Sequence, residues 1–403
     1  MRVLQIAPPW FPVPPTGYGG IEWVVASLTD GMTALGHDVT LVANGDSETS
    51  AELVSVFEGS DPHRLGDLWM EAAHAVAAYL HANDVDVIHD HTGVIGPAIA
   101  AAGGLRTPVV NTLHGPWTRD NSVLYRAISG RVALTAISHD QAARAPDGVR
   151  VSAVVHNGIE VDAYEVGRDR EDFLLFVGRA SHEKGPEVAI EVARRVGLPL
   201  VMAMKVNEPA EHRYLAQVVR PAMEGADVDL RTRVGHDEKA DLMMRARAVL
   251  VPIGWDEPFG LVMAEAAASG APVVAFRRGA APELVLDGVS GHLVPPGDVD
   301  AMTRALDGID RIDPLDCRAW AEGRFSSRRM VRRYLRVYEQ LLPERRQRPA
   351  AVSERTVRAT GTDGAMVDGV AGHGTDGQAA DGGTPPARPA TTSRLIRITS
   401  DDR

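Results

Sequence analysis

The first half of the chain alternates between short apolar runs and longer segments with an apolar residue at every third or fourth position. Short runs are typical of buried strands, and the longer spacing is typical of helices. Residues 21–35 show the helical spacing clearly, with Ile21, Val24, Leu28 and Met32 on one face. Strands alternating with helices predict a parallel sheet covered on both faces. The predicted strands are Arg2–Ala7, Val39–Ala43, Val85–His89, Val109–Leu113 and Ala133–Ile137.

The second half repeats this pattern after a break. Residues 156–170 are rich in charges and carry Gly, which predicts a crossing between two domains. Residues 326–342 form one more helix, with an apolar stripe interrupted by arginines. That stripe fits either a membrane-surface helix or a helix packed on protein, and we favour packing. The predicted strands of this half are Asp172–Gly178, Pro199–Met204, Asp229–Val234 and Ala248–Ile253.

Composition narrows the class of protein. The chain has 403 residues and a formal net charge of −12, which disfavours a nucleic-acid partner. Its single cysteine, Cys317, excludes an internal disulfide framework. No run approaches the roughly 20 apolar residues of a spanning helix, and the N-terminal apolar run is too short for a signal peptide. We therefore expect a cytoplasmic protein with at most peripheral membrane contact, whose Gly-rich segment at 350–403 is disordered.

The most informative stretch is GWDEPFGLVMAEAAASGAPVVAFRRGAAPE, at 254–283. Pro258 suits the first position of a helix, which makes Glu257 the expected N-cap. The N–H groups of Phe259, Gly260 and Leu261 would then be unpaired at the positive end of the helix. Glu265 lies about two turns further along. Two carboxylates beside free N–H donors fit a ligand that carries vicinal hydroxyls and a diphosphate.

Cations are placed where they could meet that diphosphate. Arg179 and Lys184 flank a turn between a predicted strand and a helix, and two cations there can stabilise a departing diphosphate. Only three of the 42 basic residues are lysines. Of the other two, Lys205 ends a strand and is predicted to reach the cleft, whereas Lys239 is expected on a solvated helix. Gly235 follows another strand and is expected near the nucleobase.

Three loops of the first half follow predicted strands, at the edge where parallel sheets bind ligands. The first contains Gly19 and Gly20, which allow close approach of a phosphate to a helix N-terminus. The second contains His89 and His91; a metal site is one interpretation, but no further ligand cluster accompanies them, and a polar loop lining the cleft is favoured. The third contains His114, directly before a glycine.

Taken together, these motifs resemble the family 4 retaining glycosyltransferases, which have the GT-B fold. The resemblance rests on E-x7-E from Glu257 to Glu265, opened by EPFG, and on the GR-x4-KG pattern around Arg179 and Lys184. HNGIE, at 156–160, resembles the segment that links the two GT-B halves. The segment RFSSRRMVRRYLRVYEQLL, at 324–342, resembles the family's C-terminal helix, which crosses back onto the first domain.

The resemblance implies two Rossmann-like doubly wound domains, at 1–160 on the acceptor side and 161–325 on the donor side, and a crossover helix at 326–345. It implies transfer of a sugar from a nucleotide-sugar, UDP- or GDP-linked, to an unknown hydroxyl acceptor, with retention and with no metal or other cofactor. The expected catalytic residues are His114, Arg179, Lys184 and Glu257. The expected donor-binding residues are Gly19, Gly20, Lys205, Gly235, Phe259, Gly260, Leu261 and Glu265.

Two other functions remain open on the same fold. A glycoside phosphorylase would need pyridoxal phosphate on a lysine, and only Lys205 or Lys239 is left once Lys184 binds phosphate. A non-catalytic protein that binds nucleotide-sugars is the second alternative. Transfer to any acceptor, or slow hydrolysis of the donor, separates an enzyme from a binding protein.

Overall fold

The computed structural model describes residues 1–17, 19–342 and 393–395, and it contains two parallel sheets. The first sheet has the order β14-β3-β2-β1-β4-β5-β6-β7, and every pairing is parallel. Its strands are β1 (Arg2–Ile6), β2 (Asp38–Ala43), β3 (Glu52–Ser55), β4 (Val87–Asp90), β5 (Val109–Leu113), β6 (Ala133–Ala136), β7 (Val151–Val154) and β14 (Ser393–Leu395).

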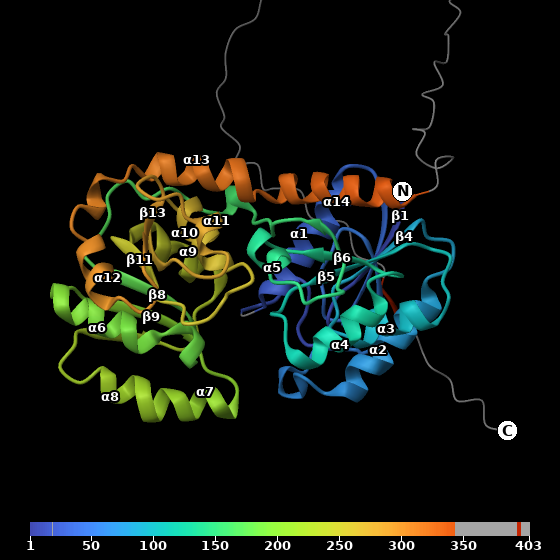
Figure 1. Ribbon diagram of the computed structural model, residues 1–403, viewed down its shortest axis with the longest axis horizontal. Helices are drawn as coiled ribbons and strands as arrows, with labels where there is room; N and C mark the ends of the chain where they lie inside the picture. The colour runs from blue at the N-terminus through green and yellow to red at the C-terminus, as the bar shows by residue number, and fades with distance from the viewer. Residues whose placement is uncertain (18, 343–392, 396–403) are drawn as a thin grey trace, which may run out of the picture. The chain divides into compact units, whose positions relative to one another are not determined.

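Helices cover both faces of this sheet, as the alternating pattern predicts (Figure 1). Strands β4 and β5 are buried along their whole length, which is the expected burial of parallel strands between two helical layers. The helices of this half are α1 (Gly20–Ala34), α2 (Leu68–His81), α3 (Ile95–Ala102), α4 (Arg119–Ile128) and α5 (His139–Ala143).

The second sheet has the order β10-β9-β8-β11-β12-β13 and is also parallel. Its strands are β8 (Leu174–Arg179), β9 (Leu200–Lys205), β10 (Val228–Arg231), β11 (Ala248–Val251), β12 (Val273–Phe276) and β13 (Gly291–Val294). The surrounding helices are α6 (Pro186–Val196), α7 (Pro209–Tyr214), α8 (Arg220–Ala222), α9 (His236–Arg245), α10 (Leu261–Ala268), α11 (Ala281–Leu284), α12 (Val299–Ala305) and α13 (Pro314–Phe325).

In each sheet the order in which the chain adds strands reverses at one point. The chain builds outward from β1 to β2 and β3, and then returns to place β4 on the other side of β1. In the second sheet, β9 and β10 lie on one side of β8, and β11 lies on the other. Ligands of doubly wound sheets bind beyond the carboxyl ends of the strands at such a switch point. The two sheets with their helices have the predicted GT-B architecture.

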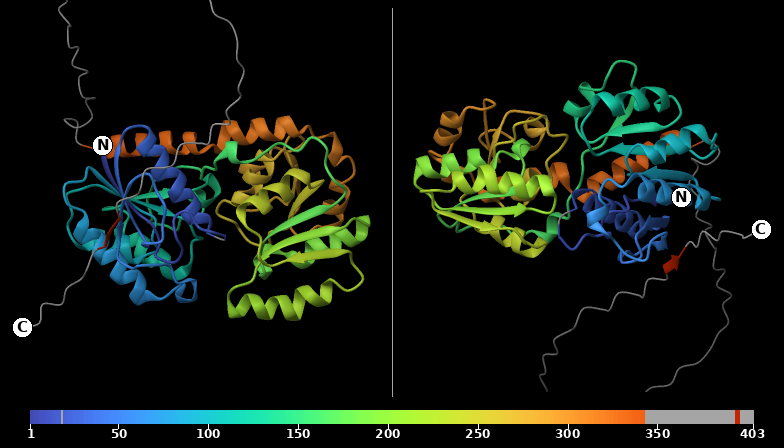
Figure 2. Two further views of the ribbon diagram at one scale, coloured as in Figure 1. Left: turned by 180° about the vertical axis from the view of Figure 1, so that it is seen from behind. Right: turned by 90° about the horizontal axis from the view of Figure 1, so that it is seen from below.

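The last described helix, α14 (Ser327–Leu341), packs against the first half although it follows the second in sequence (Figure 2). Met330, Val331, Tyr334 and Tyr338 share an apolar cluster with residues of α1 and β1. A Cβ atom on Gly31 would lie only 2.7 Å from Val331, so α1 and α14 approach closely. The helical stripe at 326–342 therefore packs on protein.

The predicted crossover helix at 326–345 extends past Leu342, so its last three positions lie outside the described residues. The expected disordered tail at 350–403 lies outside them, except that Ser393–Leu395 form the edge strand β14. Among the described helices, none is long and apolar enough to cross a membrane.

Candidate active site

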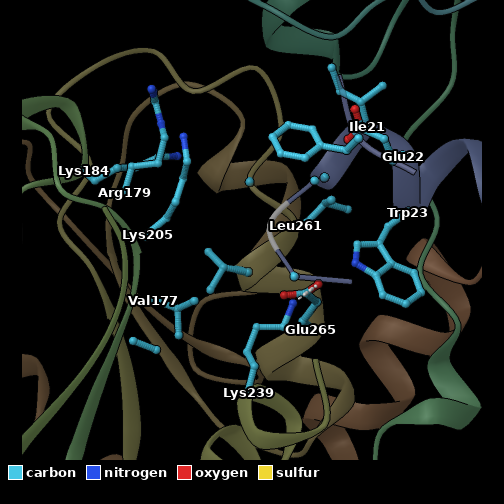
Figure 3. Close-up of a pocket in the computed structure, with 18 of the residues that line it drawn as sticks. Ile21, Glu22, Trp23, Val177, Arg179, Lys184, Lys205, Lys239, Leu261 and Glu265 are labelled. Carbon is cyan, nitrogen blue, oxygen red and sulfur yellow. Dashed lines mark hydrogen bonds and ion pairs between the residues drawn. The ribbon is translucent and has the colours of Figure 1, made fainter. Parts of the chain in front are cut away.

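All twelve residues predicted from the sequence line one cavity of about 870 Å³. Its walls come from both halves of the chain (Figure 3). Arg179, Lys184 and Lys205 extend from one side, and Glu22 and Trp23 lie on the other. The sequence therefore located the cavity, although several contacts within it differ from those expected.

The three cations of the second half differ in how far their charge is already compensated. Lys184 Nζ lies 2.6 Å from Glu257 Oε2. Lys205 Nζ lies 2.9 Å from Glu208 and 3.2 Å from Glu211. The Arg179 guanidinium, at the end of β8, has no ion pair with a described residue. Arg179 thus offers the least compensated positive charge of the three to an anion in the cavity.

The loop that carries Glu257 differs from the prediction. Helix α10 begins at Leu261. Glu257 is therefore not its N-cap, and Pro258 is not its first residue. Gly260 is the N-cap and adopts a left-handed backbone, with φ of 92°, which breaks the helical path before Leu261. Glu257 instead turns its carboxylate toward Lys184 and accepts a 2.8 Å hydrogen bond from the Trp255 indole. The expected cap is therefore a cavity carboxylate held by two donors.

The start of α10 still presents backbone donors to the cavity. Met263 N–H is bonded to the Gly260 carbonyl, whereas the N–H groups of Leu261 and Val262 have no acceptor among the described residues. Both residues line the cavity. These N–H groups carry the partial positive charge of the helix end, which favours an anion.

Glu265 lies on α10 and is held by two partners. Lys239 Nζ lies 2.7 Å from Glu265 Oε1, as the dashed line in Figure 3 shows. Burial and the hydrogen bond with Glu265 raise the pKa of the Tyr164 hydroxyl. The prediction that Lys239 lies on a solvated helix is wrong, because Lys239 lines the cavity with its side chain only 19% exposed. The rarity of lysine in this chain was a signal for a placed ammonium, but the charged residues around Lys239 favoured a solvated helix.

Gly235 precedes α9 as its N-cap and lies beside an aromatic group. The His236 ring lies 4.5 Å from the Trp23 ring of α1, between ring centroids, and 5.5 Å from the Tyr164 ring. Trp23 and His236 both line the cavity, so flat side chains from both halves meet beside Gly235 and Glu265. Such surfaces suit the stacking of an aromatic base.

The start of α1 forms the facing wall. Gly19, the N-cap, has a φ of 153°, and a Cβ atom there would meet Pro15 at 2.8 Å and Glu22 Oε2 at 2.9 Å. Glu22 is 3% exposed, and burial raises the pKa of its carboxyl to about 7. Glu22 was not among the predicted site residues, although it continues the same glycine motif in GYGGIE. A carboxyl group that titrates near neutrality therefore lies beside the predicted phosphate loop.

His89 and His91 do not line the cavity, which corrects the expectation of a polar loop there. Both rings are buried and hydrogen-bonded. His114 does line the cavity, and its Nε2 lies 3.0 Å from His91 Nδ1. Burial lowers the pKa of His114 to about 3, so its ring is neutral at physiological pH.

In the part of the chain that the structure describes, one group of side chains has the spacing of metal ligands. The ligand atoms, one each from His139, His156 and Glu283, lie within 4.8 Å of one another. The Glu283 carboxylate already accepts hydrogen bonds from His139 N–H, Asp140 N–H and His156 Nε2, at 2.8–2.9 Å. These bonds use both oxygens to hold the start of α5 against α11. The short distances among His139, His156 and Glu283 are therefore explained by hydrogen bonds that join the two halves of the chain, without a metal ion.

Gly279 supports the Glu257 loop from behind. Its φ is 56°, and a Cβ atom there would lie 2.4 Å from Glu257 N. We expect Gly279→Ala to displace Glu257, lower the melting temperature and reduce activity, because the left-handed backbone costs about 1–2 kcal/mol and the overlap adds about 1–3 kcal/mol. Gly288→Ala is the matched control, because Gly288 has φ of 77° but no atom of a described residue within 4 Å of the added carbon. Equal losses in both variants, by thermal unfolding and by steady-state kinetics, would contradict this role.

Comparison with protein families gives two matches that meet in the middle of the chain. Residues 18–163 match the model described as Glycosyltransferase Family 4. Residues 162–316 match the model described as Glycosyl transferases group 1. The two models divide the chain at the crossing between its two sheets.

Individual proteins show the same similarity. The chain is 28% identical over 362 residues to a glycogen synthase of Mycobacterium tuberculosis, covering 77% of this chain and 86% of that protein. It is 29% identical to a D-inositol 3-phosphate glycosyltransferase of Mycobacterium avium, covering 63% of this chain and 69% of that one.

Among solved structures, the chain is similar to AviGT4, a glycosyltransferase involved in avilamycin A biosynthesis, with a TM-score of 0.64 and 28% identity, covering 85% of this chain and 98% of that one. It also has the fold of Anabaena Alr3699/HepE in complex with UDP-glucose, with a TM-score of 0.65 and 18% identity over 84% of this chain and 100% of that one.

Proposed function

The chain belongs to the group 1 glycosyl transferases with a family 4 N-terminal half, and on that premise we propose that it transfers a sugar from a UDP-sugar to a hydroxyl group with retention of configuration. The observation that carries the proposal is the cavity, where a largely uncompensated arginine, an open helix N-terminus and two held glutamates converge from the predicted positions.

Each part of the cavity matches one part of such a donor. Arg179 and the N–H groups of Leu261 and Val262 suit the diphosphate. Glu265 suits the ribose hydroxyls, since a carboxylate can accept hydrogen bonds from a vicinal diol. Trp23 and His236 offer flat surfaces near the base. UDP is favoured because the similar fold of Alr3699/HepE has been solved with UDP-glucose.

The proposed reaction breaks the bond between the anomeric carbon and the phosphate oxygen while the acceptor oxygen attacks from the same face. The leaving phosphate takes the acceptor proton. This route needs no enzymic nucleophile, and it suits a cavity in which Glu257 and Glu265 are both held by cations. Arg179 and Lys184 supply positive charge at the leaving group, which supports transfer without a metal ion.

The cavity wall formed by the first half of the chain favours an acceptor without charge. Among the described residues, the first half contributes aromatic and apolar groups to the cavity, including Trp10, Phe11 and Leu65, and no Lys or Arg. Among the described lining residues of this half, Glu22 is the single acidic group. A phosphorylated acceptor would therefore meet a carboxyl group and no cation on this wall, whereas a neutral sugar or aglycone could stack on the aromatic rings.

The test combines thermal unfolding with a transfer assay, both on the purified protein. We expect melting temperature to rise more with UDP than with GDP, ADP or dTDP, since a ligand that binds the folded form stabilises it. Release of UDP from UDP-sugars should persist with a chelator, and neutral glycosides should accelerate it more than inositol 3-phosphate does. Stabilisation by another nucleotide alone would exclude UDP, and absence of any donor turnover would favour a binding protein.

Donor affinity should depend on pH through Glu22. Its carboxyl pKa is raised to about 7, so the group is protonated below pH 7 and becomes an anion as pH rises through 7. That anion would repel a diphosphate bound at the start of α1. We expect the dissociation constant of UDP-glucose to rise by up to about tenfold per pH unit above 7, because one proton is linked to binding. Glu22→Gln should remove this dependence in calorimetry between pH 6 and 8; the same slope in both proteins would exclude Glu22.

A further inference from the structure

A continuous chain of hydrogen bonds begins at His114, which is half-buried at the cavity wall, and leads into the interior of the first half. His114 Nε2 lies 3.0 Å from His91 Nδ1, and His91 Nε2 lies 3.0 Å from the side-chain oxygen of Gln5. The Gln5 amide nitrogen donates a 3.2 Å hydrogen bond to the Tyr338 hydroxyl on α14. The cavity histidine is thus connected to the last helix through two buried side chains of the first half.

The chain continues beyond Tyr338. His89 Nδ1 lies 2.6 Å from the Tyr338 hydroxyl, and His89 Nε2 lies 2.7 Å from the Thr112 hydroxyl. That hydroxyl lies 2.8 Å from the hydroxyl of Tyr334. All of these groups are buried, so water does not compete for their hydrogen bonds.

The amide of Gln5 sets the direction of the whole chain. Its nitrogen lies 3.6 Å from the sulfur of Met32, which can only accept a hydrogen bond. This contact places the amide oxygen toward His91, so His91 Nε2–H donates to Gln5. A neutral imidazole carries one N–H, which leaves His91 Nδ1 as an acceptor. His114 Nε2–H must then donate to His91 Nδ1.

Both rings are neutral, as this assignment requires. Burial lowers the pKa of His91 well below its ordinary value, with smaller contributions from His89 and His114. Burial also lowers the pKa of His114 to about 3. With its proton on Nε2, His114 has a bare Nδ1 atom. No described residue donates a hydrogen bond to that atom, and His114 lines the cavity.

We propose that Gln5 and His91 are positioning residues that hold the proton of His114 on Nε2, so that Nδ1 accepts a hydrogen bond from a hydroxyl group of the bound sugar. The opposite tautomer of His114 would present an N–H donor to the same hydroxyl, and it would leave His114 Nε2 and His91 Nδ1 as two facing acceptors with no proton between them. The tautomer itself follows from the contacts in the protein. Its effect on the sugar rests on the proposed function.

The tautomer can be measured directly by NMR of protein labelled with ¹⁵N-histidine, because protonated and bare ring nitrogens have different shifts. His114→Gln identifies the signals of His114. We expect wild-type protein to show Nε2 protonated and Nδ1 bare between pH 6 and 8. A protonated Nδ1 in the wild type would overturn the proposal without any variant that disturbs the fold.

Gln5→Leu removes the acceptor of His91 Nε2–H and should give His114 a mixture of tautomers. Tyr334→Phe is the matched control, because it removes one buried hydroxyl at the far end of the chain and should leave the His114 signals unchanged. Thermal unfolding verifies that both variants fold. Unchanged His114 signals in folded Gln5→Leu would overturn the positioning role.

Kinetics then test the catalytic consequence. Gln5→Leu should lower kcat/KM for the UDP-sugar by roughly five- to tenfold, about the value of one neutral hydrogen bond, while the dissociation constant of bare UDP stays within twofold. Tyr334→Phe should change neither quantity. A mixed tautomer with unchanged kcat/KM would overturn the contact with the sugar, whereas failure to bind UDP at all in the wild type would refute the proposed function and leave the NMR result standing.

Discussion

Replacing Arg179 by Ala should lower kcat by on the order of a hundredfold, because the diphosphate gains negative charge as the sugar departs. A positioned group that stabilises charge developing in a transition state is worth about 3 kcal/mol. Arg179 lines the cavity and its guanidinium has no ion pair with a described residue, so its charge is available to the leaving group (Figure 3). Steady-state kinetics with saturating donor measures this loss.

Two further variants show whether the loss belongs to the site. Arg179→Lys should recover only part of kcat, because lysine keeps the charge and loses the bidentate fork. Arg304→Ala, at an exposed position on α12, removes the same side chain away from the cavity and should leave kcat unchanged. An Arg179→Ala enzyme with wild-type kcat would exclude Arg179 from the leaving-group site.

The other two cations of this wall should have smaller effects. Lys184 is already bonded to Glu257, and Lys205 is held between Glu208 and Glu211. To serve a diphosphate, each must share its charge with carboxylates that the protein itself provides. Lys205 was predicted as a donor ligand from its position at a strand end, and only the structure shows Glu208 and Glu211 beside it.

The fold could be predicted largely from local pattern. Continuous apolar runs such as Val109–Leu113 are buried on both faces, so the sequence marks the whole strand, and β5 has those bounds. Strands β3 and β7 were missed, since each has four residues and includes exposed positions. Their place in the sheet depends on pairing with β2 and β6, which no local pattern records.

The residues predicted for the site do line one cavity, but several of their contacts could not be predicted. Pro258 resembles a helix start, but the left-handed Gly260 delays the helix to Leu261, and a sequence cannot show that dihedral angle. Lys239 meets Glu265 only because α9 packs beside α10. The chain of hydrogen bonds behind His114 joins Gln5 to Tyr338 across more than 300 positions, so its members could not be associated from the sequence.

Replacing each of the two cavity glutamates by Ala should change a different quantity: donor affinity for Glu265 and kcat for Glu257. Glu265 lies where ribose hydroxyls are expected, so its loss should weaken bare UDP and the UDP-sugar by similar factors. This is uniform binding loss, which raises KM with little change in kcat. A charge-assisted hydrogen bond contributes roughly 1.5–3 kcal/mol, so the change should be about ten- to a hundredfold.

Glu257→Ala should instead lower kcat by about ten- to a hundredfold with little loss of bare UDP, since Glu257 would position the reacting sugar. The structure adds a reason why UDP affinity should survive. Removing this carboxylate frees Lys184, which now lies 2.6 Å from it, to attract the diphosphate. Bare UDP should therefore bind Glu257→Ala at least as tightly as the wild type. Calorimetry with UDP on both variants, beside steady-state kinetics, decides the assignment; loss of UDP by Glu257→Ala and not by Glu265→Ala would reverse the placement of the donor along α10.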